Sequence, residues 1–459
     1  MIEHICPDCG YRYEDGANGG SFGDAPSSWC CPVCGAPKNS FAASEGGGGG
    51  ASDASGFDKS RDDVEEWMAD IKQMAETGRS IDEAMRTRKP SVSWDDILVK
   101  GGQLARRPLL QEDVVNTRTV IGPKAKQPLV LDTPVFVSHM SFGALSLEAK
   151  EALAKGAALA KTAVCSGEGG IVEPSIGNAH KYIFEYVPNL YSVTPENLRR
   201  VDAIEIKFGQ SAKPGMGGHL PGEKVTADIA KARGFPEGQG ITSPSRFKDI
   251  VTPADLRAKI DELREMSGGR PIGTKIAAGR LEEDLDFILA AGNADFITVD
   301  GRPGGTGSSP KYIKMATSIP TIFALYRARR HLDKRGVKDV SLVITGGFRI
   351  SPDFAKALAL GADAVAVATA ALIAIGCRQF KMCNTGRCPF GITSQDPELR
   401  KMIDIEESAR RLGNYLSVST REIAQFARIA GHDDVHGLCI DDLCTSNSEI
   451  SKYTEIEHV

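Results

Sequence analysis

The chain has 459 residues, of which 25% are charged and 41% hydrophobic, and its formal net charge is −5. This length allows two or three domains with a sizeable core, and the slightly acidic balance argues against nucleic acid or an anionic membrane as the main partner, because both require a basic face. No apolar run reaches the roughly 18 residues of a membrane-spanning helix, and no signal-peptide core follows Met1 to Cys6. We therefore expect a cytoplasmic protein with no nucleic-acid or membrane partner.

Four cysteines near the N-terminus form two C-x2-C pairs, Cys6 with Cys9 and Cys31 with Cys34, and a glycine follows each pair. In a reducing cytosol such clusters indicate metal ligands and not disulfides. Four thiolates at this spacing close a tetrahedral site for iron or zinc. We predict a metal-binding domain over residues 1–41, with a small aromatic core made of Tyr11, Tyr13, Phe22, Trp29 and Phe41.

Two connecting segments follow. Residues 42–58 are rich in glycine and serine, a composition that cannot pack a core and predicts a flexible linker. Residues 59–120 begin with charged, helix-prone sequence in which Val64, Trp67, Met68 and Ile71 recur at helical spacing. This pattern predicts an N-terminal helical lead-in.

Short β-branched apolar runs alternate with amphipathic segments over residues 121–376. Buried strands separated by helices indicate a parallel sheet, and about eight such units in some 250 residues favour a (β/α)8 barrel over a doubly wound sheet. The predicted strands cover 135–140, 202–207, 272–276, 295–300, 342–345 and 362–367, and the predicted helices 148–160, 253–266 and 282–291. A barrel of this type carries its active site at the C-terminal ends of the strands.

Two late loops predict a phosphate site. Gly346 and Gly347 follow the strand that ends at Thr345, and Ala368 and Thr369 follow the next strand and open a helix. Free backbone N–H groups at these positions suit a dianion, and barrels often bind phosphate after strands seven and eight. Because no G-x-G-x-x-G opens a helix after an early strand, we expect FMN and no nicotinamide-binding Rossmann unit.

Three further cysteines, Cys377, Cys383 and Cys388, have the spacing C-x5-C-x4-C. Three thiols suit a 3Fe-4S cluster, or a 4Fe-4S cluster with one foreign ligand. The segment between them is polar, with Arg378 and Lys381, which argues against simple core packing. We predict an iron-sulfur loop over 377–400 and a C-terminal helical segment over 401–459.

The N-terminal residues Cys9-Gly-Tyr-Arg-Tyr13 and the run from Trp29 to Phe41 resemble rubredoxin. This resemblance implies a mononuclear iron site that carries one electron. The four-thiolate geometry alone also fits zinc, so both metals stay open.

The larger part of the chain, from about 120 to 430, resembles glutamate synthase. The matching motifs are Met140-Ser-Phe-Gly-Ala-Leu-Ser, Gly167-Glu-Gly-Gly170, and residues 206–222, 300–310, 345–347 and 371–400. The resemblance implies an FMN barrel in which ammonia and 2-oxoglutarate form 2-iminoglutarate, which is reduced to L-glutamate. It also implies that the three late cysteines hold a 3Fe-4S cluster beside the flavin.

The same resemblance implies two sets of site residues. The residues expected around FMN are Met140, Ser141, Gly167, Lys275, Asp300, Gly301, Gly304, Gly305, Gly346, Gly347, Ala368 and Thr369. The keto-acid contacts expected are Glu168, Lys207, Gln210, Lys213 and Arg233, to which His219 is added because it replaces a glutamine of the family's substrate set. Cations at both ends suit a dicarboxylate, and the histidine leaves the exact keto acid open.

We expect no glutaminase domain of the family, because Met1 leads directly into the first cysteine pair. We therefore expect free ammonia, or a separate amidotransferase subunit, as the nitrogen source. A separate electron donor or reductase is expected to feed the N-terminal iron, then the cluster, then FMN. The alternatives are an FMN subunit similar to N-methylglutamate synthase, or a rubredoxin-linked electron carrier or redox sensor with a non-catalytic barrel.

Overall fold

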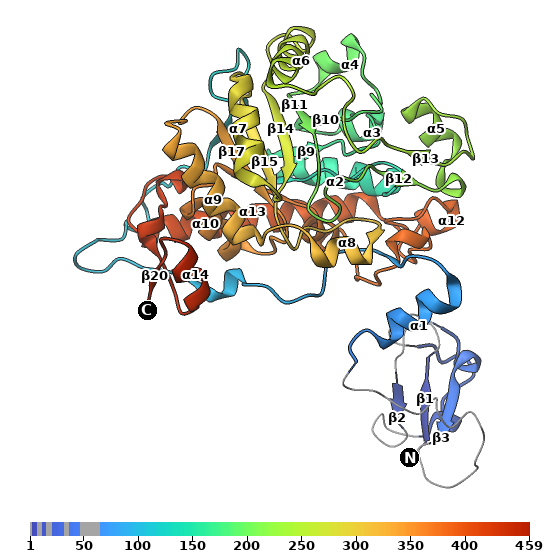
Figure 1. Ribbon diagram of the computed structural model, residues 1–459. Helices are drawn as coiled ribbons and strands as arrows, with labels where there is room; N and C mark the ends of the chain where they lie inside the picture. The colour runs from blue at the N-terminus through green and yellow to red at the C-terminus, as the bar shows by residue number, and fades with distance from the viewer. Residues whose placement is uncertain (1, 7–11, 15–20, 32–35, 46–64) are drawn as a thin grey trace. The chain divides into compact units, whose positions relative to one another are not determined.

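The computed structural model describes residues 2–6, 12–14, 21–31, 36–45 and 65–459 (Figure 1). The chain forms two compact units, Met1–Lys72 and Gln73–Val459. None of the helices in the described ranges has both the length and the apolar run that a membrane span requires.

The first unit contains a three-stranded antiparallel sheet in the order β2-β1-β3, made of β1 (Ile2–Ile5), β2 (Arg12–Glu14) and β3 (Ala42–Glu45). Short 3-10 turns cover Phe22–Asp24 and Lys38–Ser40. The Phe22 ring lies 5.5 Å from that of Trp29 and 5.2 Å from that of Phe41, which confirms the aromatic core for its described members. Tyr11 lies outside the described residues. The linker prediction is wrong at its start, because residues 42–45 form β3, and the described structure omits 46–58.

The lead-in is less helical than its sequence predicts. In the described part of 59–120 the α-helix is α1 (Met68–Thr77), followed by β4 (Asp82–Glu83), β5 (Ile97–Val99) and β6 (Thr119–Ile121). Pro90 and Pro108 interrupt the segment, and proline disfavours helix at the residue before it. The lead-in beyond α1 is therefore mainly extended chain; it belongs to the second unit and pairs within it, for example β4 with β16 (Ser309–Pro310).

Eight parallel strands close into a barrel, as the sequence predicts (Figure 1). In chain order they are β8 (Val135–Val137), β9 (Ala163–Cys165), β10 (Lys181–Tyr186), β11 (Ala203–Lys207), β14 (Ile272–Ala277), β15 (Phe296–Asp300), β17 (Ser341–Thr345) and β18 (Ala364–Val367). Pairing of β18 with β8 closes the ring. The helices between successive strands include α2 (Leu147–Leu159), α3 (Glu173–Gly177), α4 (Pro195–Arg200), α6 (Pro253–Met266), α7 (Leu281–Ala291), α9 (Thr321–Lys334) and α10 (Ser351–Ala359).

The barrel interior is apolar at one end and polar at the other. Phe136, Ile183, Phe296 and Val343 fill the lower layers, together with three residues of the hairpin formed by β6 and β7 (Leu129–Leu131). This hairpin closes the N-terminal end of the barrel, since its side chains pack with the first residues of the strands. A Cβ on Gly273 would lie 2.4 Å from the Phe296 ring, so the ring lies over this glycine of the adjacent strand. Higher along the strands the buried residues are Glu185, Glu205, Lys275, Thr298 and Asp300, which places polar chemistry at the C-terminal end.

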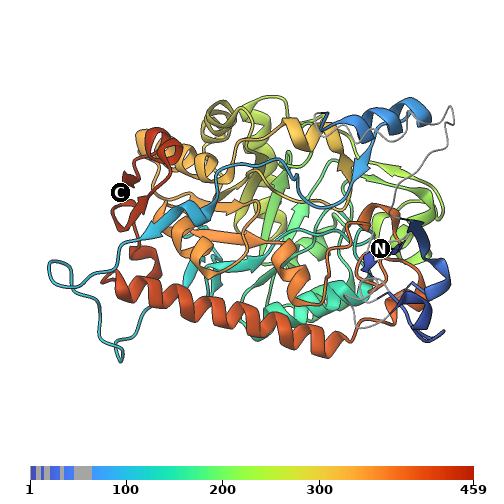
Figure 2. The same cartoon turned by 90° about the horizontal axis from the view of Figure 1, so that it is seen from below.

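A long helix, α13 (Ile405–Ile429), packs along α2, as Figure 2 shows. The two helices approach closely at glycines, because a Cβ on Gly156 would lie 2.7 Å from the Cβ of Leu412. The segment 401–459 is thus helical at first and then mixed. It also contains α14 (Ser448–Tyr453), β20 (Glu457–His458) and β19 (Leu443–Thr445), which pairs with β5.

The loops at the C-terminal ends of the strands carry smaller elements. After β11 come β12 (His219–Leu220), α5 (Ala227–Arg233) and β13 (Ile241–Thr242); after β15 comes α8 (Lys311–Ala316); after β18 come α11 (Thr369–Ala374) and α12 (Pro397–Arg400).

Candidate functional site

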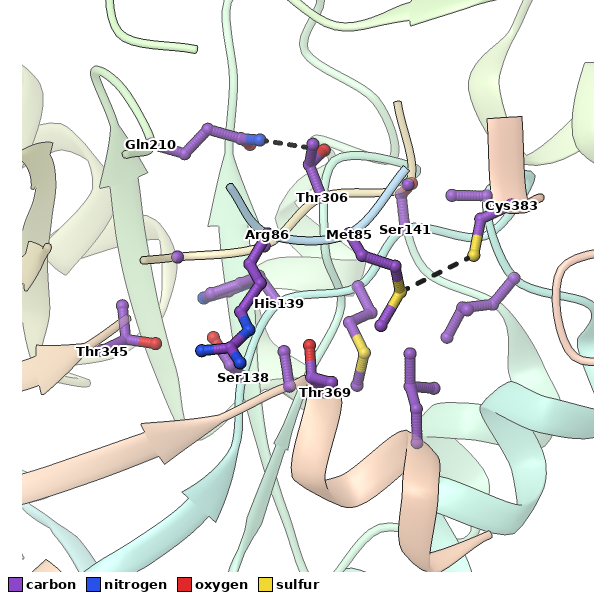
Figure 3. Close-up of a pocket in the computed structure, with 18 of the residues that line it drawn as sticks. Met85, Arg86, Ser138, His139, Ser141, Gln210, Thr306, Thr345, Thr369 and Cys383 are labelled. Atoms are coloured by element: carbon purple, nitrogen blue, oxygen red, sulfur yellow. Dashed lines mark hydrogen bonds between the residues drawn. The ribbon is translucent and has the colours of Figure 1, made fainter. Parts of the chain in front are cut away.

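A cavity of about 830 Å³ opens at the C-terminal ends of the barrel strands (Figure 3). Its walls come from the loops that follow the strands, and from Asp82, Met85 and Arg86 of the lead-in. The volume and the mixture of apolar and charged lining residues suit a cofactor with a small substrate.

The cavity brings together most of the site residues expected from the sequence. The expected residues that line it are Met140, Ser141, Glu168, Lys207, Gln210, Lys213, His219, Arg233, Lys275, Asp300, Gly304, Gly305, Gly346, Gly347, Ala368 and Thr369. Gly167 and Gly301 do not line it. A Cβ on Gly167, where φ is +73°, would lie 2.4 Å from the carbonyl carbon of Met140, and one on Gly301 would lie 2.6 Å from Cα of Thr321. These two glycines allow loops to approach each other and do not face the cavity.

The two loops proposed for phosphate follow the seventh and eighth strands, β17 and β18, as predicted. Gly346 has φ +119°, and a Cβ there would lie 2.1 Å from the carbonyl oxygen of Gly301. Gly347 has φ +85°, and its Cβ would lie 2.7 Å from Cδ of Pro303. Both positions therefore require glycine, which leaves backbone bare along this wall of the cavity.

A buried ion pair joins two of the expected keto-acid residues. Lys207 Nζ donates to Glu168 Oε2 at 2.8 Å, and the two side chains are largely buried, with 11% and 14% of their surface exposed. Burial alone would raise the pKa of Glu168, but the attraction of Lys207 and then of Lys213 lowers it to about 2. Burial opposes the charge on Lys207, yet Glu168 and Glu185 raise its pKa. Both groups are therefore charged at neutral pH.

Further cations and donors face the same part of the cavity. Burial and the nearby Lys207 lower the pKa of Lys213. Arg233 Nη2 donates to the carbonyl oxygen of Phe142 at 2.8 Å, and its guanidinium lies 5.1 Å from the centre of the Tyr191 ring. Arg233 Nε is buried and has no hydrogen-bond partner in the described structure. The guanidinium of Arg233 therefore keeps one N–H group that the described residues do not bind.

Gln210 and His219 lie at the rim of this region. Gln210 Nε2 donates to Thr306 Oγ1 at 3.3 Å (Figure 3). His219 is exposed, and its Nδ1 lies 3.2 Å from Thr242 Oγ1. Both therefore reach the cavity from loops, unlike Lys207, which ends a strand.

Sequence reasoning missed His139, Glu185 and Glu205, which form a cluster of buried charges with the predicted Lys275 and Asp300 at the cavity. His139 Nε2 lies 2.9 Å from Glu205 Oε2, and Glu185 Oε1 lies 3.6 Å from Lys275 Nζ. Burial would lower the pKa of Lys275, but Glu185 and then Asp300 raise it overall. Burial raises the pKa of Asp300. The signal available in the sequence is a charged residue at an inward position of an apolar strand, as in Lys181-Tyr-Ile-Phe-Glu-Tyr186.

The lead-in also supplies residues that sequence reasoning missed. Met85 N–H donates to the carbonyl oxygen of Thr306 at 2.7 Å. The Cys383 thiol sulfur lies 3.9 Å from the Met85 thioether sulfur (Figure 3). Arg86, the next residue, also lines the cavity. The helical expectation for residues 59–120 concealed this role, because a segment outside the barrel gives no sign of reaching its mouth.

The three late cysteines lie around one small cavity, and Cys383 also lines the large one. Burial and the neighbouring Cys388 raise the pKa of Cys377, and burial and Cys377 raise that of Cys383. The Gln379 N–H donates to Cys377 Sγ at 3.4 Å.

Two of the four N-terminal thiols are described. Cys6 and Cys31 are buried together with Ala36. Cys9 and Cys34 lie outside the described residues, so the four-thiolate site stays a prediction.

The fold and site define a (β/α)8-barrel protein with a ligand cavity at the strand ends. Among solved structures, a mutant of a chimera of (S)-mandelate dehydrogenase superposes with a TM-score of 0.51 at 15% identity, over 77% of this chain and 88% of that one. A flavocytochrome b2 variant with sulfite bound gives 0.51 at 18% identity, over 79% and 78%. These likenesses show the barrel fold.

Residues 75–433 match the conserved region in glutamate synthase. A glutamate synthase large subunit-like protein of Rhizobium meliloti is 38% identical over 85% of this chain and 92% of its own length. An archaeal glutamate synthase [NADPH] of Methanocaldococcus jannaschii is 40% identical over 70% of this chain, which spans 62% of that relative. The chain therefore belongs to the glutamate synthase family.

Proposed function

We propose that this protein is an FMN-dependent oxidoreductase of the glutamate synthase type. Its substrate in this proposal is the imine of a dicarboxylic 2-keto acid, such as 2-oxoglutarate, with ammonia, and its product is the amino acid. The observation that carries the proposal is one cavity that combines the buried Lys207–Glu168 pair with Lys213, Arg233 and a glycine-lined wall after strands seven and eight.

The cavity fits FMN by its own features. Gly346 and Gly347 line the cavity without a side chain, because a Cβ on either would collide with Gly301 or Pro303, and the following loop supplies Thr369. At the other end Glu185 Oε1 and Lys275 provide a buried acceptor and a buried cation. FMN would supply hydride transfer as a two-electron step, while Lys275 would favour an anionic reduced ring.

The residues around the Lys207–Glu168 pair would bind the keto acid. A dicarboxylate requires a cation at each end, and Lys207, Lys213 and Arg233 line one region of the cavity. Glu168 keeps Lys207 charged and in place by its 2.8 Å hydrogen bond. Within this proposal Lys207 and Arg233 orient the carboxylates, and Gln210 and His219 define the far end of the substrate.

The late cysteines would hold a 3Fe-4S cluster. The fit rests on three thiols around one small cavity and on the N–H of Gln379 directed at a sulfur, since such hydrogen bonds are usual at cluster thiolates. Bound there, a cluster would pass electrons singly from a separate donor, and Cys383 is the ligand that borders the large cavity. The N-terminal thiols would add a rubredoxin-type iron to this route.

The test is purification without oxygen, followed by denaturation and identification of the released flavin. We expect FMN and iron, and we expect chemically reduced protein to consume 2-oxoglutarate and ammonium with formation of glutamate. Release of FAD, or no flavin binding by protein reconstituted with FMN, contradicts the cofactor. Full FMN occupancy without turnover of any dicarboxylic keto acid contradicts the reaction.

A further inference from the structure

We infer that Lys150 is a positioning residue that fixes the loop expected to contact the flavin against the loop that carries Glu168. This inference rests on the proposed function for the identity of the ligand. It concerns a residue of α2 that does not line the cavity, so it adds a component to the site that neither the sequence motifs nor the cavity reveal.

The side chain of Lys150 is 1% exposed and ends among three carbonyl groups. Nζ donates to the carbonyl oxygens of Met140 at 3.0 Å, Cys165 at 2.9 Å and Ser166 at 2.9 Å. An ammonium has three N–H donors, so each of its hydrogens has one acceptor. A single side chain thus ties the loop after β8 to the loop after β9.

These two loops hold different parts of the candidate site. Met140 and Ser141 follow β8 and line the flavin part of the cavity, while Ser166 and Glu168 follow β9 and lead to the substrate part. The loops touch at Gly167, where a Cβ would lie 2.4 Å from the Met140 carbonyl carbon. The Gly167 N–H also donates to His139 Nδ1 at 3.2 Å. The Lys150 ammonium therefore acts where a small shift would change the distance between flavin and keto acid.

Burial of the Lys150 ammonium between α2 and the strands costs desolvation free energy. A methionine or leucine would fill the same space between the helix and the strands without desolvating an ammonium. Three carbonyls directed at one point would then lack a donor. The contacts explain why the ammonium is retained, and they predict that its loss acts locally on the two loops.

The experiment compares Lys150→Met with Lys356→Met. Lys356 is a matched control because it is also buried and donates from Nζ to a backbone carbonyl, that of Trp94, at 2.8 Å, outside the cavity lining. Two quantities are measured for each full-length protein: amide hydrogen exchange over residues 138–143 and 165–170, and the dissociation constant of FMN from the apoprotein. Thermal unfolding shows whether the two variants lose comparable stability.

We expect Lys150→Met to speed exchange in both loops and to weaken FMN binding by about tenfold or more, the size of one lost charge-assisted hydrogen bond. Lys150→Gln, which keeps two N–H donors, should fall between wild type and methionine. Lys356→Met should leave both readouts unchanged. Unaltered exchange in both loops of Lys150→Met overturns the inference. If the wild-type protein binds no FMN but Lys150→Met still loosens both loops, the proposed function fails and the positioning role stands.

Discussion

Lys207 Nζ and Glu168 Oε2 lie 2.8 Å apart at the ends of two strands that are not neighbours in the barrel, β11 and β9. The strand between them, β10, contributes Glu185, whose Oε2 lies 3.8 Å from the same ammonium. The cation thus faces two carboxylates, one hydrogen-bonded and one held at a longer distance. A bound keto-acid carboxylate would replace part of this attraction.

Substitution of Glu168 by glutamine should damage both stability and catalysis. Loss of one partner of a largely buried pair costs about 3 kcal/mol of unfolding free energy, and a Lys207 ammonium that Glu168 no longer holds in place should lower kcat/KM roughly 30-fold. Chemical denaturation and steady-state kinetics measure the two effects. Glu173→Gln is the matched control, because its pair with Arg200 is largely exposed and should contribute under about 1 kcal/mol. Equal effects of the two substitutions would refute the role of the buried pair.

His219 is expected to define which keto acid is accepted. It is exposed at the rim of the cavity and hydrogen-bonds at 3.2 Å to Thr242, so its replacement should not disturb the core. We expect His219→Gln to change the ratio of kcat/KM values for 2-oxoglutarate and other dicarboxylic keto acids by about tenfold, with little change in thermal stability. Kinetics with a series of keto acids of different length measure this ratio. A constant ratio across the series would place His219 outside the substrate site.

Gly346→Ala tests the wall expected to face the flavin phosphate. The added methyl group would lie 2.1 Å from the Gly301 carbonyl oxygen, and φ of +119° is itself unfavourable for alanine. The loop must shift, and we expect at least a roughly 100-fold loss of FMN affinity, with a much smaller loss for riboflavin, which has no phosphate. Fluorescence titration of the apoprotein with both flavins gives the comparison. A similar loss for both would mean that the glycine acts on the ring and not on the phosphate.

Cys377→Ser should remove the cluster and spare the flavin. The thiol borders the small cavity and not the large one, so serine changes a ligand without changing the cavity wall. We expect iron and acid-labile sulfide to fall by about the content of one cluster while FMN content stays constant. Electron delivery from an external one-electron donor should stop, and chemically reduced flavin should still react. Cys439→Ser, distant in sequence from the loop, serves as the control, and an equal loss of iron there would contradict the assignment.

The pH dependence of Lys150 separates function from stability. Burial lowers its pKa to about 8, opposed by Cys165 on β9 and Glu185 on β10. Between pH 8 and the usual value of 10.5 the unfolded chain binds more protons than the native one, so this group makes the unfolding free energy rise with pH. Deprotonation of Lys150 over the same pH range also removes one of the three N–H groups that donate to the loop carbonyls. We expect FMN affinity to fall above pH 8 while stability does not, and Lys150→Met to abolish that part of the profile.

Sequence patterns predicted the barrel because β-branched runs mark strands such as 296–300 and 341–345 almost to the residue. They predicted the cavity lining because family motifs end those runs. They did not reveal β10, since Lys181 and Glu185 interrupt its apolar pattern although the Glu185 side chain is buried among other charges. They also missed Met85 and Lys150, whose contributions depend on chain packing across long sequence separations. The spacing of residues along the sequence gives no sign that Lys150, on a helix, donates to three loop carbonyls.

The hairpin of β6 and β7 closes the barrel at its N-terminal end, opposite the cavity. Leu129 and Leu131 close its base, and among the described residues the cavity is bordered by the strand-end loops and by Asp82, Met85 and Arg86. In the proposed reaction, with FMN bound deep in the barrel, the amino-acid product would have to leave through this opening before the next keto acid could enter. Product exchange, and not only the chemical step, would then limit turnover.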